Sequence, residues 1–372
     1  MKKIKILYFV DRLDIGGIQT FIFDIIKNLQ PKFQIDVLTL DDGKVYEYVD
    51  LFKKSGINVY KLDNIWINSP IDYIKYQKAA TKFFKENKYD IVHLHASSKN
   101  YLLMKIAKKS GISVRIAHSH SLGFQTNSKF KKLIGELFKN KLIKYSTHFF
   151  ACSDLAGKWL FDKKQFTVIN NGIKLERFTF DEKIRNDLRG ELMVKNDELL
   201  LGHVGRFTTQ KNHSYLIHVF AEIVKQNKKA KLILLGSGEL EDNIKSLVKK
   251  LNLDEKVIFA GFKTNANEYF QAIDAFILPS QIEGLGIVLI EAQAAGIPCF
   301  ASKDSIPKEA KITDLVQFIS LNEKPKVWAE AILNTDMIRK DTVADIKKKE
   351  YTIEATCEKL QKIYEMSVDS NE

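Results

Sequence analysis

The chain has 372 residues, of which 45% are apolar and 28% charged, a composition that supports a large folded core and argues against disorder. At roughly 150 residues per domain, two domains are expected. The three cysteines, Cys152, Cys299 and Cys357, have no paired metal-ligand spacing and are odd in number, which favours a reduced, cytoplasmic compartment without a disulfide framework. No apolar stretch reaches about 18 residues, so we expect no membrane-spanning helix.

The positive charge is concentrated in the first half of the chain. Residues 1–180 carry 31 Lys and Arg against 16 Asp and Glu, a net charge of +15, whereas residues 181–372 carry a net charge of −3. A first half of this kind is expected to meet a polyanion or an anionic surface. We expect no nucleic acid partner, because the chain has no helix-turn-helix signature, zinc-finger spacing or RNA-recognition aromatic motif.

Apolar runs of strand length alternate with amphipathic helices along the whole chain, which predicts an α/β protein with parallel sheets covered on both faces. The opening run, MKKIKILYFV, superficially resembles a signal peptide, but Asp11 and Arg12 end it early and it is better interpreted as a first buried strand. Further strands are predicted at 33–40, 57–62, 90–96, 114–120 and 148–153, and then at 199–207, 230–236, 256–262, 275–280 and 298–302.

Each set of strands is expected to form one doubly wound, Rossmann-like domain. The linker is placed in TVINNGIKLERFTF, where Asn170, Asn171 and Gly172 indicate a turn. The expected domains are residues 1–172 and 173–351, and a last helix within residues 352–372 is expected to pack back on the first domain. A ligand is expected in a cleft between the two sheets, at their carboxyl edges.

Two weak signals follow strands of the first domain. Gly16 and Gly17 stand at the start of a helix, where backbone N–H groups can cradle a phosphate, although two adjacent glycines more often form only a turn. Histidines occur in pairs on one face of two strand ends: His93 with His95, and His118 with His120. A zinc site is conceivable, but no carboxylate or cysteine stands beside them at ligand spacing, so we expect no metal.

The densest positive charge lies in NSKFKKLIGELFKNKLIKY. Six lysines, Lys129, Lys131, Lys132, Lys139, Lys141 and Lys144, interleave with Phe130, Leu133, Ile134, Leu137, Phe138, Leu142 and Ile143. This spacing predicts an apolar stripe opposite a lysine-rich face, as in a helix at an anionic membrane surface. A helix packed on the core with a solvated basic face fits the same pattern equally well. At about 1 kcal/mol per lysine, six would suffice for reversible membrane attachment.

Loops after strands of the second domain carry stronger signals. In GRFTTQKN, Arg206 and Lys211 follow Gly205 and are suited to neutralising a diphosphate, Arg by binding two oxygens and Lys as a point charge. Alone, such cations would be taken for surface charges. LLGSGELE adds Gly236 and Gly238 at another strand end on the same predicted rim, and this convergence favours a ligand site.

The most informative motif is EGLGIVLIE, which follows the apolar strand DAFILPS. Gly284 and Gly286 open a helix whose N-terminus can receive a phosphate, and Glu283 and Glu291 can each accept hydrogen bonds from sugar hydroxyls. Two glutamates in a solvated turn and on an exposed helix face would give the same spacing. The position of the motif at the carboxyl end of a strand favours the interpretation that it grips a sugar nucleotide.

The order GGIQ, HSH, GRFTTQKN, LLGSGELE, FAGF and DAFILPSQIEGLGIVLIEAQAAGIP resembles that of family 4 of the retaining GT-B glycosyltransferases, especially the bacterial branch that builds exopolysaccharides and capsules. The resemblance spans nearly the whole chain. It implies two Rossmann-like domains, with a nucleotide-activated sugar held mainly by the second domain and an acceptor mainly by the first.

The resemblance also assigns roles to residues. Arg206 and Lys211 match the cations on the donor diphosphate, Glu283 the contact to sugar hydroxyls, and Glu291 the grip on the ribose. The remaining matches are the loop Gly284, Leu285 and Gly286 under the sugar and phosphate, the closing loop Gly16 and Gly17, Phe262 and Lys263 beside the base, and His120, or His118, near the reacting sugar. At Gln19 many members carry glutamate, which makes an acid role there doubtful.

The reaction implied is retaining transfer of a hexose or N-acetylhexosamine from a nucleoside-diphosphate sugar, with uridine diphosphate first, to a glycan acceptor that is free or linked to a lipid diphosphate. No D-x-D motif is present, so no cofactor or divalent metal is expected, and the enzyme is placed on the inner face of the plasma membrane. A sugar-nucleotide epimerase or hydrolase and a non-catalytic sugar-nucleotide-binding subunit remain as alternatives. A nicotinamide oxidoreductase is disfavoured by the missing glycine fingerprint.

Overall fold

The computed structural model describes residues 3–13, 16–29, 31–41, 43–44, 46–62, 70–95, 98–124 and 128–369. The chain divides into two compact units. The first unit comprises residues 1–172 and 353–372, and the second comprises residues 173–352. The division after Gly172 falls in the passage where the sequence placed the linker.

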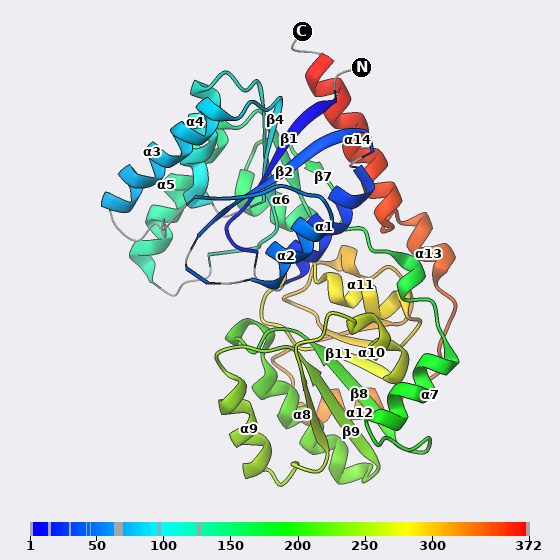
Figure 1. Cartoon of the computed structure of the whole chain (residues 1–372). Helices are drawn as coiled ribbons and strands as arrows, with labels where there is room; N and C mark the ends of the chain where they lie inside the picture. Colours follow the sequence, from blue (N-terminus) through cyan, green and yellow to red (C-terminus); the bar gives the residue numbers. More distant parts are fainter. Residues whose placement is uncertain are drawn as a thin grey trace. The chain divides into compact units, whose positions relative to one another are not determined.

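The first unit is built on a parallel sheet of seven strands (Figure 1). Its strands are β1 (Ile4–Val10), β2 (Phe33–Leu40), β3 (Val59–Leu62), β4 (Ile91–Leu94), β5 (Val114–Ser119), β6 (His148–Ala151) and β7 (Thr167–Val168). Their spatial order is β3-β2-β1-β4-β5-β6-β7. The central strands are buried on both faces, which is why they read as almost continuous apolar runs in the sequence.

Helices cover both faces of this sheet. One face packs on α1 (Gly17–Leu29), α2 (Glu47–Lys54) and the C-terminal helix α14 (Ile353–Asp369). The other helices are α3 (Pro70–Glu86), α4 (Tyr101–Lys109), α5 (Lys129–Tyr145) and α6 (Asp154–Phe161), with a 3-10 turn η1 at Ser98–Asn100. Helices α3, α4 and α5 lie side by side as one layer on the opposite face, as right-handed crossovers from β3, β4 and β5 require (Figure 1).

The helix α14 packs on the first unit, where the sequence placed it. Its buried residues Ile353, Cys357, Leu360 and Tyr364 recur at helical spacing and join the core formed by α1 and β1. The ring of Tyr364 lies 5.7 Å from that of Phe33, and its hydroxyl lies 2.6 Å from the hydroxyl of Tyr8. The end of the chain thereby contributes to the middle of the first sheet.

The second unit contains a parallel sheet of six strands in the order β10-β9-β8-β11-β12-β13. These are β8 (Leu199–Val204), β9 (Ala230–Leu235), β10 (Val257–Gly261), β11 (Ala275–Leu278), β12 (Cys299–Ser302) and β13 (Val316–Ile319). Its helices are α7 (Glu182–Glu191), α8 (His213–Gln226), α9 (Glu241–Lys250), α10 (Ala266–Ala272), α11 (Ile287–Ala294), α12 (Pro325–Leu333) and α13 (Val343–Lys348). Short 3-10 turns occur at Leu175–Arg177, Thr209–Lys211 and Lys308–Ala310.

The structure confirms the predicted α/β class and adds two edge strands that the sequence did not predict. The strand β7 has two residues, and in β13 the exposed Gln317 interrupts the apolar run. An edge strand is buried less completely than a central one, so its sequence signal is weaker.

The lysine-rich helix α5 differs from its prediction. Lys139, expected on a solvated basic face, is buried, with its ammonium 5.2 Å from the Trp159 ring and 3.0 Å from the Glu136 carboxylate. The predicted single apolar stripe is divided: Leu142 faces the core, whereas Phe130, Leu133 and Leu137 are exposed. The spacing of apolar residues along the sequence does not distinguish the buried face of α5 from the exposed one, because the core of the first unit covers only part of this helix.

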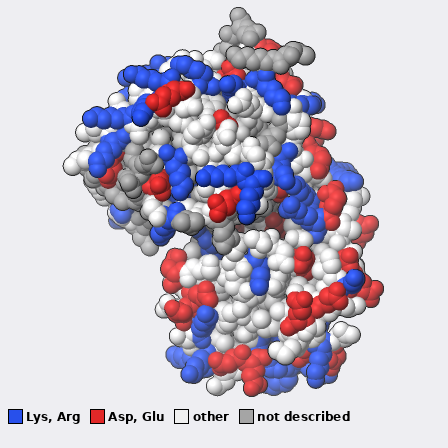
Figure 2. All heavy atoms as spheres, in the orientation of Figure 1, with Lys and Arg blue, Asp and Glu red and all other residues white. Residues whose placement is uncertain are grey.

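Among the described residues, no helix is both long enough and apolar enough to cross a membrane. Figure 2 shows Lys and Arg side chains over much of the visible surface of the first unit, in keeping with the charge of its sequence.

A buried charge cluster connects α7 to the sheet of the second unit. The Asp274 carboxylate accepts hydrogen bonds from Arg185 Nη2 at 2.5 Å, Arg189 Nη1 at 3.2 Å and the backbone N–H of Leu200 at 2.8 Å. The Arg189 side chain is 2% exposed, so its charge depends on this carboxylate and on carbonyl groups around it.

We predict that Asp274→Ala destabilises the second unit by about 3–5 kcal/mol, because the Arg189 charge would stay buried without its carboxylate partner. The measurement is the urea midpoint of the second unit. As a control, Asp197→Ala removes the exposed ion pair with Lys229 and should leave the midpoint unchanged. Equal midpoints for wild type and Asp274→Ala would contradict the assignment.

Candidate functional site

The second unit has its topological switch point between β8 and β11. The chain moves outward from β8 through β9 to β10 on one side, and from β11 through β12 to β13 on the other. Loops that follow β8 and β11 therefore leave the sheet in opposite directions at its carboxyl edge, which is the usual place of a ligand in such sheets. The two strongest motifs of the sequence, GRFTTQKN and EGLGIVLIE, are these two loops.

An ion pair joins the two loops. Lys211 Nζ lies 2.6 Å from Glu283 Oε1, and the two side chains are 18% and 8% exposed. Gln210 adds two hydrogen bonds: its carbonyl accepts from the N–H of Gln281, and its side-chain amide donates to the carbonyl of Ile282, both at 2.7 Å. Glu283 is further fixed by its own N–H, which donates to the Ser305 carbonyl after β12 at 3.0 Å.

The loop after Glu283 turns directly into α11. Gly286 is the residue before the helix and has φ of +80°, a conformation that favours glycine. Leu285 is buried beneath this turn, while Gly284 and Glu291 are half-buried. The first N–H groups of α11 thus end beside Glu283, which gives the loop both a carboxylate and a positive helix terminus.

A close backbone contact shapes the loop after β8. Gly236, after β9, has φ of +137°, and a Cβ atom there would lie 2.1 Å from the Gly205 carbonyl oxygen. The Gly205 N–H also donates to the Leu235 carbonyl at 2.9 Å. Because only glycine fits at 236, this contact sets the path of the chain into Arg206, whose side chain is exposed.

Phe262 and Lys263 directly follow β10, two strands from β8 at the same edge, and both are half-buried. Lys263 Nζ lies 5.9 Å from the centre of the Tyr269 ring. All the site residues predicted in the second domain therefore lie in loops at one edge of one sheet, or on α11, which starts at that edge.

The first unit has its switch point between β1 and β4. Gly17 begins α1, and Gly16 precedes it in the loop after β1. Gln19, at the position where many family members carry glutamate, donates its amide to the Arg12 carbonyl at 3.0 Å and so holds this loop. Asn100, after β4, donates to the Asp11 carboxylate and connects the two sides of the switch point.

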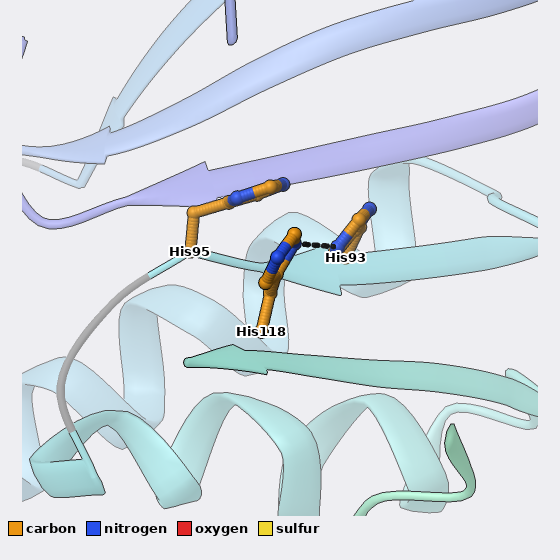
Figure 3. A group of neighbouring side chains, drawn as sticks. All are labelled: His93, His95 and His118. Atoms are coloured by element: carbon orange, nitrogen blue, oxygen red, sulfur yellow. Dashed lines mark hydrogen bonds between the residues drawn. The ribbon is translucent and has the colours of Figure 1, made fainter. Parts of the chain in front are cut away.

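Four histidines and two tyrosines lie beside it in two hydrogen-bonded groups whose rings contact one another: Tyr8, Tyr364, His93 and His118 in one, and His95 and His120 in the other. His93 Nδ1 lies 2.7 Å from the Tyr364 hydroxyl, and His93 Nε2 lies 3.2 Å from His118 Nδ1 (Figure 3). His95 Nδ1 lies 2.9 Å from His120 Nε2. His93 and His118 lie inside their strands, whereas His120 follows β5 and is half-buried. Of the two histidines predicted near the reacting sugar, His120 is thus the one at the edge.

The histidine cluster can be compared with a metal centre. Ring nitrogens of His93, His95 and His118 lie within 4.8 Å of one another, the one such group among the described residues. His93 already uses both ring nitrogens in hydrogen bonds, so it would have to break one to bind a metal. The residues present fit a hydrogen-bonded network better than a metal site.

Burial controls the charge of these rings. Desolvation, with repulsion between neighbouring imidazoles, lowers the pKa values of His93, His95 and His118 well below 6.5, and desolvation lowers that of His120 to about 3. The four imidazole rings are therefore neutral at pH 7, and they can donate or accept hydrogen bonds but carry no positive charge.

Several residues around the sites were not identified from the sequence. Gln210 lies inside a recognised motif, but its hydrogen bond to the Ile282 carbonyl can be predicted only when the order of the strands is known. Tyr364 belongs to a helix more than 240 residues after His118. His203 and His213 form a ring contact of 4.6 Å beneath the Lys211 loop, and burial lowers their pKa values to about 4 and about 2. A histidine inside the apolar strand LLLGHV was the one available signal.

Two family models of glycosyltransferases match this chain. A family model described as Glycosyltransferase Family 4 matches residues 15–177, and one described as Glycosyl transferases group 1 matches residues 184–348. The EpsF protein of Bacillus subtilis is 28% identical over 335 residues, covering 88% of this chain and 86% of that protein. An Escherichia coli UDP-Gal:alpha-D-GlcNAc-diphosphoundecaprenol alpha-1,3-galactosyltransferase is 27% identical over 293 residues, covering 75% and 73%.

Among solved structures, HepE of Anabaena in complex with UDP and glucose is similar with a TM-score of 0.80 and 17% identity, over 97% of this chain and 99% of that one. The likeness shows the fold. The two family models together span both units, and the chain belongs to family 4 of the glycosyltransferases with the GT-B fold. It is an enzyme that transfers a sugar.

The neutral histidine network predicts a pH dependence of stability. A histidine whose folded-state pKa lies below its unfolded value of about 6.5 stabilises the fold fully above that pH and loses the contribution as the pH falls. We therefore expect the thermal midpoint of the first unit to fall between pH 7.5 and pH 5.5. The free energy of unfolding should fall with pH over the same range. His120→Gln should make that fall smaller by at most about 1.4 kcal/mol per pH unit.

The control is His218→Gln, which replaces an exposed histidine on α8 and should leave the dependence unchanged. A midpoint that does not move between pH 7.5 and pH 5.5 would show that these rings are already charged, or solvated, in the folded protein.

Proposed function

We propose that this chain is a retaining glycosyltransferase that moves a hexose or N-acetylhexosamine from a UDP-sugar to an acceptor linked to a lipid diphosphate, in bacterial polysaccharide assembly. The observation that carries the proposal is the Lys211–Glu283 pair at the switch point of the second unit. This pair places a cation for a diphosphate and a carboxylate for sugar hydroxyls within one hydrogen bond of each other.

The remaining donor contacts follow from the positions of the loops. Arg206 and Lys211 neutralise the diphosphate together with the N–H groups at the start of α11. Glu283 accepts hydrogen bonds from hydroxyls of the transferred sugar, and Glu291, one turn after the start of α11, accepts them from the ribose hydroxyls. The backbone of Gly284, Leu285 and Gly286 lies under sugar and phosphate. Gly205 and Gly236 shape the diphosphate loop, and Phe262 and Lys263 border the base.

The chemistry is governed by charge separation at the anomeric carbon. The bond from this carbon to the diphosphate breaks, and negative charge grows on the leaving phosphate, where Arg206, Lys211 and the helix terminus stabilise it. The acceptor oxygen bonds to the carbon from the face that the phosphate leaves, and its proton passes to the phosphate. His120, neutral at pH 7, donates or accepts a hydrogen bond at the sugar. With two protein cations on the diphosphate, no divalent metal is needed in this scheme.

Donor and acceptor classes are supported by the relatives. HepE binds UDP and glucose in its solved complex, and the Escherichia coli relative is named for UDP-Gal and a diphosphoundecaprenol-linked acceptor. The first unit, residues 1–172 and 353–372, has 31 Lys and Arg against 20 Asp and Glu, a net charge of +11 that supports an anionic partner, and we place the enzyme at the inner leaflet of the plasma membrane, where such acceptors are anchored.

We predict that Lys211→Ala or Glu283→Ala lowers turnover by about 10²–10³-fold, as expected for the loss of one preorganised charge-stabilising group. The measurement is UDP release in the presence of a lipid-linked acceptor. Lys229→Ala removes an exposed lysine of the same unit and is the matched control, with turnover unchanged. Near-normal turnover in both site variants would refute the assigned site.

A donor screen tests the reaction itself. UDP-sugars are incubated with a panel of lipid-diphosphate-linked glycans, and nucleoside diphosphate and glycosylated product are measured. The proposal expects product only when both substrates are present, with the anomeric configuration of the donor retained. Isomerised sugar nucleotide or free sugar from donor alone would identify an epimerase or hydrolase, and binding without turnover a non-catalytic subunit.

A further inference from the structure

Large apolar side chains are exposed on two neighbouring helices of the first unit. Their exposed fractions are 64% for Ile71 and 58% for Ile74 on α3, and 71% for Phe130, 62% for Leu133 and 56% for Leu137 on α5. We call these five residues the apolar patch. Single exposed apolar residues are common on proteins, but five on adjacent helices at helical spacing mark an interaction surface.

Ring contacts connect α3, α4 and α5 beside the patch. The ring of Tyr73, between Ile71 and Ile74 in sequence, lies 6.3 Å from the ring of Phe138, which follows Leu137. Both rings also contact Tyr101 of α4, at 6.1 Å and 5.2 Å. The half-buried aromatic side chains hold the helices side by side, and the patch residues next to them in sequence point away from the core.

The position of the patch within the fold is informative. In a parallel sheet, each crossover helix starts near the carboxyl edge and runs back toward the amino edge. The patch occupies the first turns of α3 and the first half of α5, so it lies toward the carboxyl edge of the first sheet (Figure 1). That is the edge that carries Gly16, Gly17 and His120, where the proposed acceptor would present its reacting end.

Lysines surround the patch. Residues 70–145 contain sixteen Lys and Arg against four Asp and Glu, a net charge of +12, which equals that of the whole chain. Nine exposed lysines lie on the two helices: Lys75, Lys78, Lys82, Lys85, Lys129, Lys131, Lys132, Lys141 and Lys144. Figure 2 shows Lys and Arg side chains among uncharged ones over the visible part of this layer.

We propose that the apolar patch and the lysines beside it dock the enzyme on an anionic lipid leaflet. The apolar side chains enter the boundary between headgroups and acyl chains while the ammonium groups contact lipid phosphates, as on interfacial helices. A second copy of the chain fits less well, because self-association would bring two surfaces of the same strong positive charge together. The inference rests on the proposed function, in that a lipid-linked acceptor requires an enzyme held at the membrane.

The docking surface is tested by flotation of the full chain with vesicles of phosphatidylcholine alone or with phosphatidylglycerol. We expect wild type to float with the anionic vesicles only. Phe130→Ser, Leu133→Ser and Leu137→Ser together should weaken binding at least tenfold. Lys129→Glu, Lys131→Glu and Lys132→Glu together should weaken it by on the order of 100-fold, since one lysine near an anionic leaflet changes affinity roughly fivefold.

Matched controls lie on the second unit. Met193→Ser with Ile338→Ser removes apolar side chains that are 82% and 66% exposed, and Lys249→Glu with Lys250→Glu and Lys308→Glu reverses three exposed lysines. Both control variants should float like wild type. Thermal stabilisation by UDP should be the same in all docking variants, so failure of docking is distinguishable from failure of the proposed donor site, which Lys211→Ala reports.

Three results would overturn the proposal. The first is recovery of wild type away from anionic vesicles at physiological salt, and the second is flotation of the patch variants equal to that of wild type. A wild-type dimer in solution that the serine variant converts to monomer would instead assign the patch to contact between two copies.

Discussion

The ion pair between Lys211 and Glu283 determines how the second unit presents its site, because it joins two loops separated by about seventy residues of sequence. A carboxylate that is 8% exposed needs a positive partner, and the Lys211 side chain without that carboxylate would sample many positions. The parallel sheet makes the pair possible by ending β8 and β11 at the same edge. The hydrogen bond from the Gln210 side chain to the Ile282 carbonyl and the close approach of Gly236 to Gly205 fix the surrounding backbone.

The first unit presents polar groups in another way. Its switch point is lined by neutral imidazoles, of which His93 and His118 are connected through Tyr364 to α14, so the middle of this sheet depends on a segment far along the chain. The charge of this unit is instead on the outer helices, where lysines and exposed apolar residues share α3 and α5. A neutral, hydrogen-bonding edge suits an uncharged glycan hydroxyl, and a basic outer layer suits a lipid phosphate.

The two units thus divide the work proposed for a sugar transfer from a charged donor. In the proposed reaction, cations and a helix terminus of the second unit meet the diphosphate, whose negative charge grows as the bond breaks. The edge of the first unit offers hydrogen bonds from neutral rings and adds no positive charge. The proposed docking patch on its outer helices is a separate feature of the same unit.

The sequence by itself determined the α/β class, the central strands and the loops that carry the site, because strands buried on both faces are continuous apolar runs and Gly-containing loops follow them. It missed β7 and β13, which are short edge strands, and it misplaced Lys139, whose burial depends on Trp159 from another helix. Only the tertiary structure decided that Lys211 meets Glu283, that Tyr364 reaches His93, and which side of α5 stays exposed. Those facts depend on strand order and on contacts between distant segments, and neither is encoded in local periodicity.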